Sequence, residues 1–377
     1  MKNFFKYIVL LYALNLNGQI ISEKINSSSL NETRLVDIYL PENISENIIK
    51  TPLILVLEGN ELFDLVVSNV KYLSKIGYMP PSIVLGIRQD KLNQVYKDCE
   101  VDKNRGFLSD FSQNFMKFIV SEAIPLISKK YGDPFLKIII GRNYSANFIN
   151  HFIFSPNPIF STFISITPEF NTSLIEPLKN SFENNNLSIN YYVSNSINLK
   201  SSQKKSISLL TDFLKNVEDE KLNFIIDQFS SPDEFSAPAY SIPLALEKIF
   251  KIYQPISPSE YRSKLLSNDS PTHVYLTEKY LNIFQKLKIR KKVILNDIAA
   301  IFEAAKRKND IESIFVLADI CINQYPEKMI GHYFNGIGHE LINENKKALK
   351  HYEKAYTYEP IDFITKELIL SKIETLK

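Results

Sequence analysis

Residues 137–147 carry the residue pattern in this chain that is closest to a catalytic motif. They read Lys-Ile-Ile-Ile-Gly-Arg-Asn-Tyr-Ser-Ala-Asn, an apolar strand that runs into a turn and then into a helix. Covalent hydrolysis at such a turn uses the pattern Gly-x-Ser-x-Gly, in which the turn exposes the serine hydroxyl. Asn143 occupies the serine position. Because a neighbouring base cannot convert an amide into an attacking oxyanion, the sequence predicts a turn of this kind without its nucleophile.

Ser145 is the nearest hydroxyl that could replace the missing serine. It lies two residues further along the helix, which rotates its side chain by about 200° away from the direction of the turn. We therefore do not expect it to act as the nucleophile. Ser145 and Ala146 are small, so strand and helix can still approach each other closely.

Alternating strand and helix patterns must position this turn. Short apolar runs typical of strands cover residues 34–40, 53–57, 83–87, 136–140, 163–166, 189–193 and 222–226. Helical patterns cover residues 61–76, 111–131, 144–154, 206–217 and 241–253. This alternation predicts an α/β fold with a doubly wound, mostly parallel sheet.

Composition narrows the class of protein. The chain has 377 residues, a length that predicts two folded units. Its net charge of +2 gives no electrostatic case for binding nucleic acid. Two distant cysteines, Cys99 and Cys321, exclude a disulfide framework and a site of cysteine ligands. The five histidines show none of the usual metal-binding spacings. We expect no metal and no cofactor.

The first residues resemble a secretory signal peptide. Lys2 and Lys6 precede a mostly apolar run at residues 7–16, which is shorter than the roughly 20 residues of a membrane span. We expect a signal peptide over residues 1–19 and a secreted or periplasmic protein with no membrane span. A buried N-terminal strand is the alternative interpretation of the same residues.

The tail is predicted to be helical and repetitive. Pro255 and Pro258 interrupt the strand–helix alternation, so the first domain is assigned to residues 20–255 and the tail to residues 256–377. Pro326 and Pro360 are 34 residues apart, which is the period of tetratricopeptide repeats. Residues 338–360 form the better copy. Two repeats are few for a solenoid, so the tail either packs on the first domain or adds divergent helices over residues 261–304.

Residues 34 to about 253 resemble the enterochelin-esterase-like family of α/β hydrolases. The similar segments are residues 53–60, 80–87, 115–131 and 163–168. Some members of that family carry tetratricopeptide repeats after the hydrolase domain. The resemblance implies an α/β-hydrolase fold with a Ser-His-acid triad, which can be followed onto this chain position by position.

All three triad positions are substituted. The family's elbow, Gly-His-Ser-x-Gly-Gly, corresponds to residues 141–146, where Asn143 replaces the serine. The family's histidine corresponds to Glu234, and no other histidine lies between His151 and His273. The acid is expected in the loop after the strand 189–193, at Ser194, where no Asp or Glu is near.

Some features of the ancestral site need no particular side chain. The oxyanion hole would consist of the backbone N–H groups of Asn60 and Tyr144. We expect the three former triad positions to converge in one small cleft at the carboxyl ends of the strands. Arg142 and Tyr144 are expected to fill that cleft, with Arg142 paired to the carboxylate of Glu234.

The resemblance and the substitutions together predict an exported esterase-like protein that no longer catalyses. Its work would be binding or scaffolding, with a small-molecule ligand in the old cleft or a protein or peptide partner on the helical tail. The alternative is an active hydrolase of a siderophore, carbohydrate or acyl ester.

Overall fold

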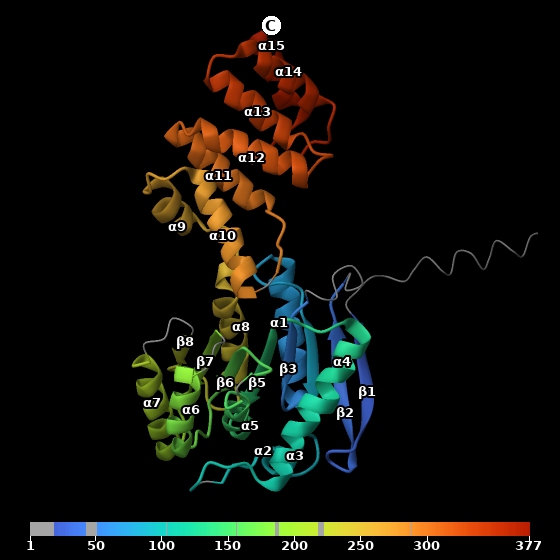
Figure 1. Cartoon of the computed structure of the whole chain (residues 1–377), viewed down its shortest axis with the longest axis vertical. Coiled ribbons are helices and arrows are strands. Elements are labelled where there is room, and N and C mark those ends of the chain that lie inside the picture. Colours follow the sequence, from blue (N-terminus) through green and yellow to red (C-terminus); the bar gives the residue numbers. More distant parts are fainter. Residues whose placement is uncertain are drawn as a thin grey trace, which may run out of the picture. The chain divides into compact units, whose positions relative to one another are not determined.

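A computed structural model describes residues 19–42, 51–102, 104–155, 157–184, 188–217, 222–287 and 289–377 (Figure 1). Residues 1–18, most of the predicted signal peptide, lie outside the described residues. The chain divides into two compact units, Met1–Tyr253 and Gln254–Lys377.

An eight-stranded sheet forms the centre of the first unit. Its spatial order is β1-β2-β4-β3-β5-β6-β7-β8. Strand β2 pairs antiparallel with β1 and β4, and all other neighbours are parallel. The strands are β1 (Gln19–Ser27), β2 (Glu32–Leu40), β3 (Leu53–Val56), β4 (Ile83–Ile87), β5 (Lys137–Arg142), β6 (Thr162–Ile166), β7 (Ile189–Asn195) and β8 (Leu222–Gln228). The predicted mostly parallel sheet is confirmed.

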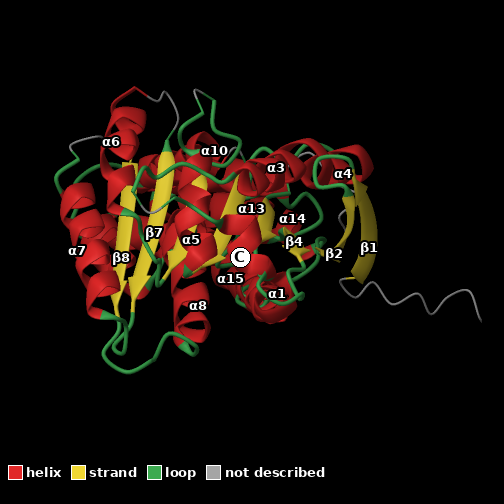
Figure 2. Cartoon of the chain, turned by 90° about the horizontal axis from the view of Figure 1, so that it is seen from below, coloured by secondary structure: helices red, strands yellow, loops and turns green. Residues whose placement is uncertain are grey.

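Helices cover both faces of this sheet. Helices α1 and α8 lie on one face, and α3 and α4 lie on the other (Figure 2). The helices are α1 (Gly59–Lys75), α2 (Gln94–Cys99), α3 (Asp110–Phe118), α4 (Ile124–Tyr131), α5 (Tyr144–Phe148), α6 (Ile175–Asn184), α7 (Ser201–Lys215) and α8 (Ala237–Ile249). A π-helical stretch, Ile119–Ala123, joins α3 to α4, so the predicted long helix over residues 111–131 is present.

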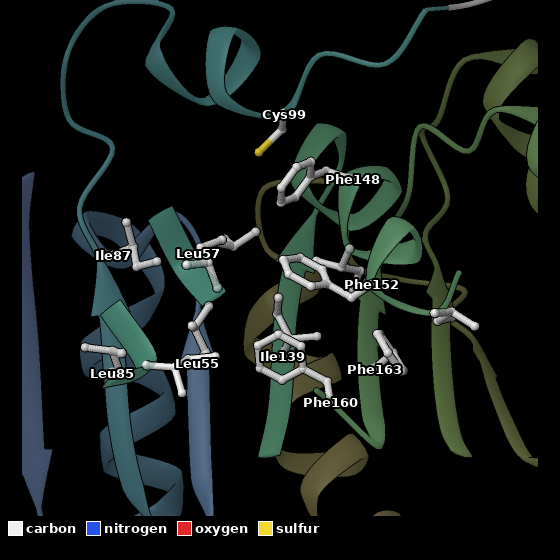
Figure 3. Packing of buried hydrophobic residues seen from close by; sticks show 14 of the residues in the cluster. Leu55, Leu57, Leu85, Ile87, Cys99, Ile139, Phe148, Phe152, Phe160 and Phe163 are labelled. Atoms are coloured by element: carbon white, nitrogen blue, oxygen red, sulfur yellow. The ribbon is translucent and has the colours of Figure 1, made fainter. Parts of the chain in front are cut away.

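The apolar strand runs explain the core. All residues of β3, β4 and β6 are buried, as expected for parallel strands covered on both faces. Phe148 and Phe152, on and just after α5, pack with Ile139, Phe160 and Phe163 of the central strands and the segment before β6 (Figure 3). This packing fixes the helix that follows the Asn143 turn against the sheet.

Sequence patterns missed three elements of this unit and misplaced the starts of two helices. Strand β1 was not predicted because its many polar residues, on an edge strand, hide the alternation of its apolar positions. The short helices α2 and α6 have few buried positions from which to detect a period. Helices α7 and α8 begin several residues before the predicted positions of 206 and 241.

The second unit is helical. Its helices are α9 (Pro258–Glu260), α10 (Thr272–Leu287), α11 (Leu295–Lys308), α12 (Ile311–Gln324), α13 (Ile330–Leu341), α14 (Asn345–Tyr356) and α15 (Lys366–Leu376), with a π-helical stretch at Tyr261–Leu266. Its described residues contain no strand and only two isolated bridges. Ser257 and Glu260 form a capping box at the start of α9. Helices α10 and α11 lie before α12–α15 in the chain and share the same buried core.

The predicted helix pair at residues 338–360 needs correction. Gly338 lies inside α13, so the antiparallel pair consists of α13 and α14 and begins at Ile330. Ala348, Tyr352 and Ala355 of α14 are all fully buried in the core of the second unit. Gly336 faces Tyr352 so closely that a Cβ there would lie 2.4 Å from the ring. The predicted boundary lay at Gly338, which reads as a helix end, but a Cβ there would lie 2.8 Å from the Phe315 ring, so this glycine is a close contact inside α13.

Candidate functional site

The Asn143 turn has the backbone of a nucleophile elbow. Strand β5 ends at Arg142, α5 begins at Tyr144, and Asn143 between them adopts φ 50° and ψ −108°. This region is costly for a residue with a side chain. A Cβ on Gly141 would lie 2.6 Å from the carbonyl carbon of Ser145, so strand and helix meet at a distance that only glycine allows.

The side chain of Asn143 is held from the neighbouring strand. Its Oδ1 accepts a hydrogen bond of 2.9 Å from Oγ1 of Thr167, the residue after β6. Its backbone N–H donates to the carbonyl of Ile166 at 3.0 Å, and its carbonyl accepts from the N–H of Glu169 at 3.1 Å. The amide at the top of the elbow is therefore a fixed acceptor.

Ser145 is committed to a structural contact. It is fully buried, and its Oγ lies 2.7 Å from Oε1 of Glu58, to which it donates. Oγ of Ser145 also accepts a hydrogen bond of 2.8 Å from the backbone N–H of Arg142. This serine lies beneath the turn, with its hydroxyl bonded within the fold.

Glu58 stands at the end of β3 and is 4% exposed. Its Oε2 accepts from Nη2 and Nε of Arg142 at 2.6 and 3.1 Å, and Nη2 also reaches Glu61. Burial raises the pKa of Glu58, and the Arg142 charge opposes that rise without cancelling it. The predicted pairing of Arg142 with Glu234 is wrong, because Glu58 is nearer and more deeply buried and therefore needs the guanidinium more.

Glu234 lies half-buried in the turn between β8 and α8. Its side chain makes no hydrogen bond or ion pair with any other described residue. The preceding Asp233 shapes this turn, since its Oδ1 accepts from the backbone N–H groups of Phe235 and Ser236. A carboxylate thus stands where the family's histidine is expected, without a group that would tune it as a base.

Ser194 belongs to strand β7 and not to the loop in which it was predicted. It is fully buried, and its Oγ accepts from Oγ of Ser241 in α8 at 2.8 Å. Its backbone nevertheless borders the elbow, since its carbonyl accepts from the N–H of Thr167 at 3.1 Å. Strand β7 runs two residues longer than its apolar run, and this extension turns Ser194 towards α8.

Main-chain hydrogen bonds connect the segments that hold the three former triad positions. Asn143 bonds to the end of β6, and the residue after β6 bonds to Ser194. The N–H of Ile197, in the loop after β7, donates to the carbonyl of Pro232 at 3.3 Å, close to Glu234 in sequence. The three segments are therefore neighbours at the carboxyl end of the sheet, although the Ser194 side chain points away.

The predicted oxyanion positions lie in the first turns of two helices. Asn60 is the second residue of α1 and Tyr144 the first of α5, so their N–H groups have no acceptor within the helix. Asn60 Oδ1 accepts from the N–H of Gln89 at 3.1 Å. The Tyr144 ring is 36% exposed and packs edge-on against Tyr96 at 5.5 Å, at the surface and not as a buried plug.

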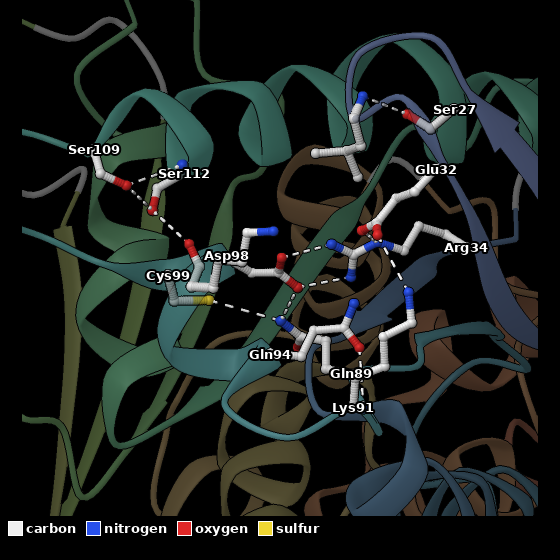
Figure 4. Close-up of polar contacts among 12 residues, drawn as sticks. Ser27, Glu32, Arg34, Gln89, Lys91, Gln94, Asp98, Cys99, Ser109 and Ser112 are labelled. Atoms are coloured by element: carbon white, nitrogen blue, oxygen red, sulfur yellow. Dashed lines mark hydrogen bonds and ion pairs between the residues drawn. The ribbon is translucent and has the colours of Figure 1, made fainter.

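Gln89 connects the backbone of Glu58 to a buried polar network that the sequence analysis did not predict. Arg34 in β2 makes a bidentate pair with Asp98 at 2.6 and 2.8 Å (Figure 4). Gln89 donates to Asp98 at 2.8 Å and accepts from the N–H of Glu58 at 2.8 Å. No local pattern joins Arg34 to Asp98, which lie 64 positions apart, so only the folded sheet reveals the network.

The first unit contains one histidine, His151, and it has a structural role. It is 8% exposed, with Nε2 2.9 Å from the carbonyl of Gly106 and Nδ1 3.2 Å from that of Phe148. Burial lowers its pKa. Among the described residues no group of three or more His, Cys, Asp or Glu side chains could hold a metal ion. No described helix has the length and apolarity needed to cross a membrane.

A solved structure from Capnocytophaga ochracea, an uncharacterised protein, is similar over nearly all of this chain. The two share 30% identity over 95% of this chain and 99% of that one, with a TM-score of 0.83. This chain belongs to the same family. No family model and no curated protein sequence matches this chain.

More distant solved structures show the fold of the first unit. An IroE-like serine hydrolase from Shewanella oneidensis has 15% identity and a TM-score of 0.60, covering 80% of this chain and 98% of its own. The siderophore hydrolase EstA from Aspergillus nidulans has 12% identity and a TM-score of 0.50, covering 62% and 94%. The predicted esterase-like α/β-hydrolase fold is confirmed, and these identities show the fold alone.

Proposed function

We propose that this protein is a non-catalytic member of the esterase-fold hydrolases that works by binding or scaffolding. The observation that carries the proposal is Asn143, which keeps the strained backbone of a nucleophile elbow but places an amide there. Strain of this kind costs on the order of 1–3 kcal/mol and persists only where surrounding structure enforces it. The scaffold of the site has been retained without its reacting atom.

The surrounding residues support the same conclusion. Nucleophilic hydrolysis needs a hydroxyl beside a base whose pKa suits the working pH. Ser145 donates its proton to Glu58, and His151 is fixed to two backbone carbonyls. Glu234 has no hydrogen-bond or ion-pair partner among the described residues that would orient it as a base. Backbone donors at Asn60 and Tyr144 alone would supply a small residual acceleration, about 10³–10⁴-fold over water.

The alternative, an active ester hydrolase, draws on the names of the structural neighbours. Those names include serine and siderophore hydrolases. We give this alternative less weight because it would require a nucleophile that the arrangement at Asn143 does not offer.

Export, a ligand and a partner complete the proposal. Lys2, Lys6 and the apolar run after them support a signal peptide of about nineteen residues. A small molecule would bind over Asn143 at the carboxyl end of the sheet, and a protein or peptide would bind the helical tail, whose 34-residue repeat resembles tetratricopeptide units. Mass spectrometry of the native protein tests export, and an intact Met1 on a cytosolic protein would contradict it.

Two reagents test the central proposal on the purified chain. We expect no covalent adduct with a fluorophosphonate and no hydrolysis of a short p-nitrophenyl ester above the rate of a heat-denatured sample. The Asn143→Ala variant is the matched control, because any activity it shares with the wild type does not arise at the elbow. A stoichiometric adduct on a serine, Ser145 above all, would overturn the proposal.

A further inference from the structure

Three of the five histidines form a column between helices α13 and α14. The rings of His339 and His351 stack with centroids 5.2 Å apart, and those of His351 and His332 lie 6.0 Å apart. Aromatic rings close both ends, Phe315 of α12 at 5.0 Å from His339 and Tyr358 at 5.1 Å from His332. The column therefore runs through the seam where α13 and α14 pack together.

The surroundings of the column favour the neutral form of its imidazole rings. His332 is 7% exposed, and the Nδ1 atoms of His332 and His351 are buried without a hydrogen-bond partner among the described residues. A protonated ring carries an N–H on both nitrogens, so each Nδ1 would become a buried donor with no acceptor. Burial without a partner is costly for a polar group and more so for a charged one.

The charged groups around the column do not compensate for protonation of its buried members. Lys354 of α14 acts on both His332 and His351 as a like charge. Glu344, at the turn before α14, pairs with His339 Nδ1 at 2.7 Å but also with Lys347. On the α15 side, the carboxylate of Glu340 pairs with Lys372. Among the described residues, the one acid that pairs with a histidine of the column is Glu344, and it does so at the His339 end.

We propose that the histidine column makes the second unit sensitive to mild acid, so that protonation loosens the α13–α14 seam. Two imidazolium groups 5–6 Å apart repel each other most strongly where water is excluded. Opening the seam would hydrate both rings and expose the buried face of α13 to a partner. The inference is independent of catalysis in the first unit.

Proton linkage fixes the direction of the effect. Burial, Lys354 and His351 lower the pKa of His332 to about 4, and burial first and His339 next lower that of His351. An opened seam returns these groups towards the ordinary value of about 6.5. The folded form is therefore favoured above about pH 6.5 and loses stability as the pH falls towards 4.

Hydrogen exchange on the full chain tests the proposal. We expect the protection of amides in α13 and α14, corrected for intrinsic exchange, to fall at least about tenfold between pH 7.5 and pH 5. Replacing both histidines that have a buried Nδ1 (His332→Asn with His351→Asn) should abolish most of this fall. The control His273→Asn, outside the column, should leave it unchanged. An equal fall in the double variant, or none in the wild type, would overturn the proposal.

A second measurement uses the wild-type protein, so it does not depend on whether a substituted chain folds. In the full-length wild type with ¹³C-labelled histidine, the assigned NMR ring signal of His332 should remain neutral at pH 5.5, and that of His351 should titrate below the ordinary value of about 6.5. If the ring signals of His332 and His351 both titrate near the ordinary value of about 6.5, the column does not resist protonation and the inference fails.

Discussion

Asn143 and Thr167, two non-glycine residues with φ angles of 50° and 41°, are joined by a side-chain hydrogen bond of 2.9 Å. Each follows a central parallel strand, β5 or β6, at the carboxyl edge of the sheet. Strained residues concentrate where a fold once held or still holds a functional geometry. The pair shows that the fold maintains this geometry even though the first residue is an amide.

Replacing Asn143 separates strain from side-chain bonding. Asn143→Gly and Asn143→Ala both remove the bond to Thr167, but only glycine adopts a positive φ without cost. We expect the glycine variant to be more stable than the alanine variant by about 1 kcal/mol or more in urea unfolding. Equal stabilities would mean that the backbone at Asn143 is not strained in solution.

Restoring one triad residue should not restore catalysis. The members of a triad act as a unit, so one without the others gives little. We expect Asn143→Ser to fold and to hydrolyse a p-nitrophenyl ester no faster than Asn143→Ala. Activity in the serine variant that exceeds the alanine variant by about a hundredfold would reveal a base that the arrangement around Glu234 does not show.

Gly141 should tolerate no side chain. A Cβ there would meet the backbone of Ser145 at 2.6 Å, whereas at Gly77, with a φ of 75°, no atom lies within 4 Å of the added carbon. We expect Gly77→Ala to cost about 1 kcal/mol from φ alone. Gly141→Ala should cost about 2 kcal/mol more, because strand and helix must separate. The comparison uses chemical denaturation, and similar costs would contradict the close approach.

The Glu58–Arg142 pair should be coupled strongly. Arg142→Met leaves Glu58 buried without its cation, which we expect to destabilise the fold by about 3–5 kcal/mol. Adding Glu58→Gln should recover part of that loss, since a neutral amide still accepts from Ser145. A double-mutant cycle in urea measures the coupling, and simple additivity of the two changes would refute it.

The same pair predicts a pH dependence. The pKa of Glu58 is raised in the fold, with burial as the largest cause. A raised pKa favours the folded state at pH below the ordinary carboxyl value of about 4.3, and this contribution is lost as the pH rises through the folded value. We expect Glu58→Gln to lack that loss when the free energy of unfolding is followed from pH 4 upwards. Parallel pH curves for variant and wild type would contradict the shift.

Gly336 tests the packing of the helix pair. Alanine normally stabilises a helix by about 1 kcal/mol relative to glycine. Here its Cβ would lie 2.4 Å from the Tyr352 ring, so we expect Gly336→Ala to destabilise the second unit instead. Glu353→Ala, at an exposed site on α14, is the control and should be near neutral. Thermal unfolding followed by circular dichroism gives the comparison.

The sequence by itself determined the central strands and the elbow. Runs such as residues 138–140 are apolar at every position, and only a strand covered on both faces uses such a run. Gly141 and the small residues after Asn143 determined the sharp turn, because steric limits on backbone approach act locally. The amide at the predicted nucleophile position, Asn143, was equally readable, since it depends on residue identity alone.

Only the tertiary structure decided the partners of the charged groups. Arg142 pairs with Glu58 and not with Glu234. Strands β3 and β5 are neighbours in the sheet, and the more deeply buried carboxylate is stabilised most by a cation. Ser194 bonds to Ser241 because β7 extends two residues beyond its apolar run and so includes Ser194. Pairings across 84 and 47 positions have no local signal. They follow from strand order and burial, which exist only in the folded chain.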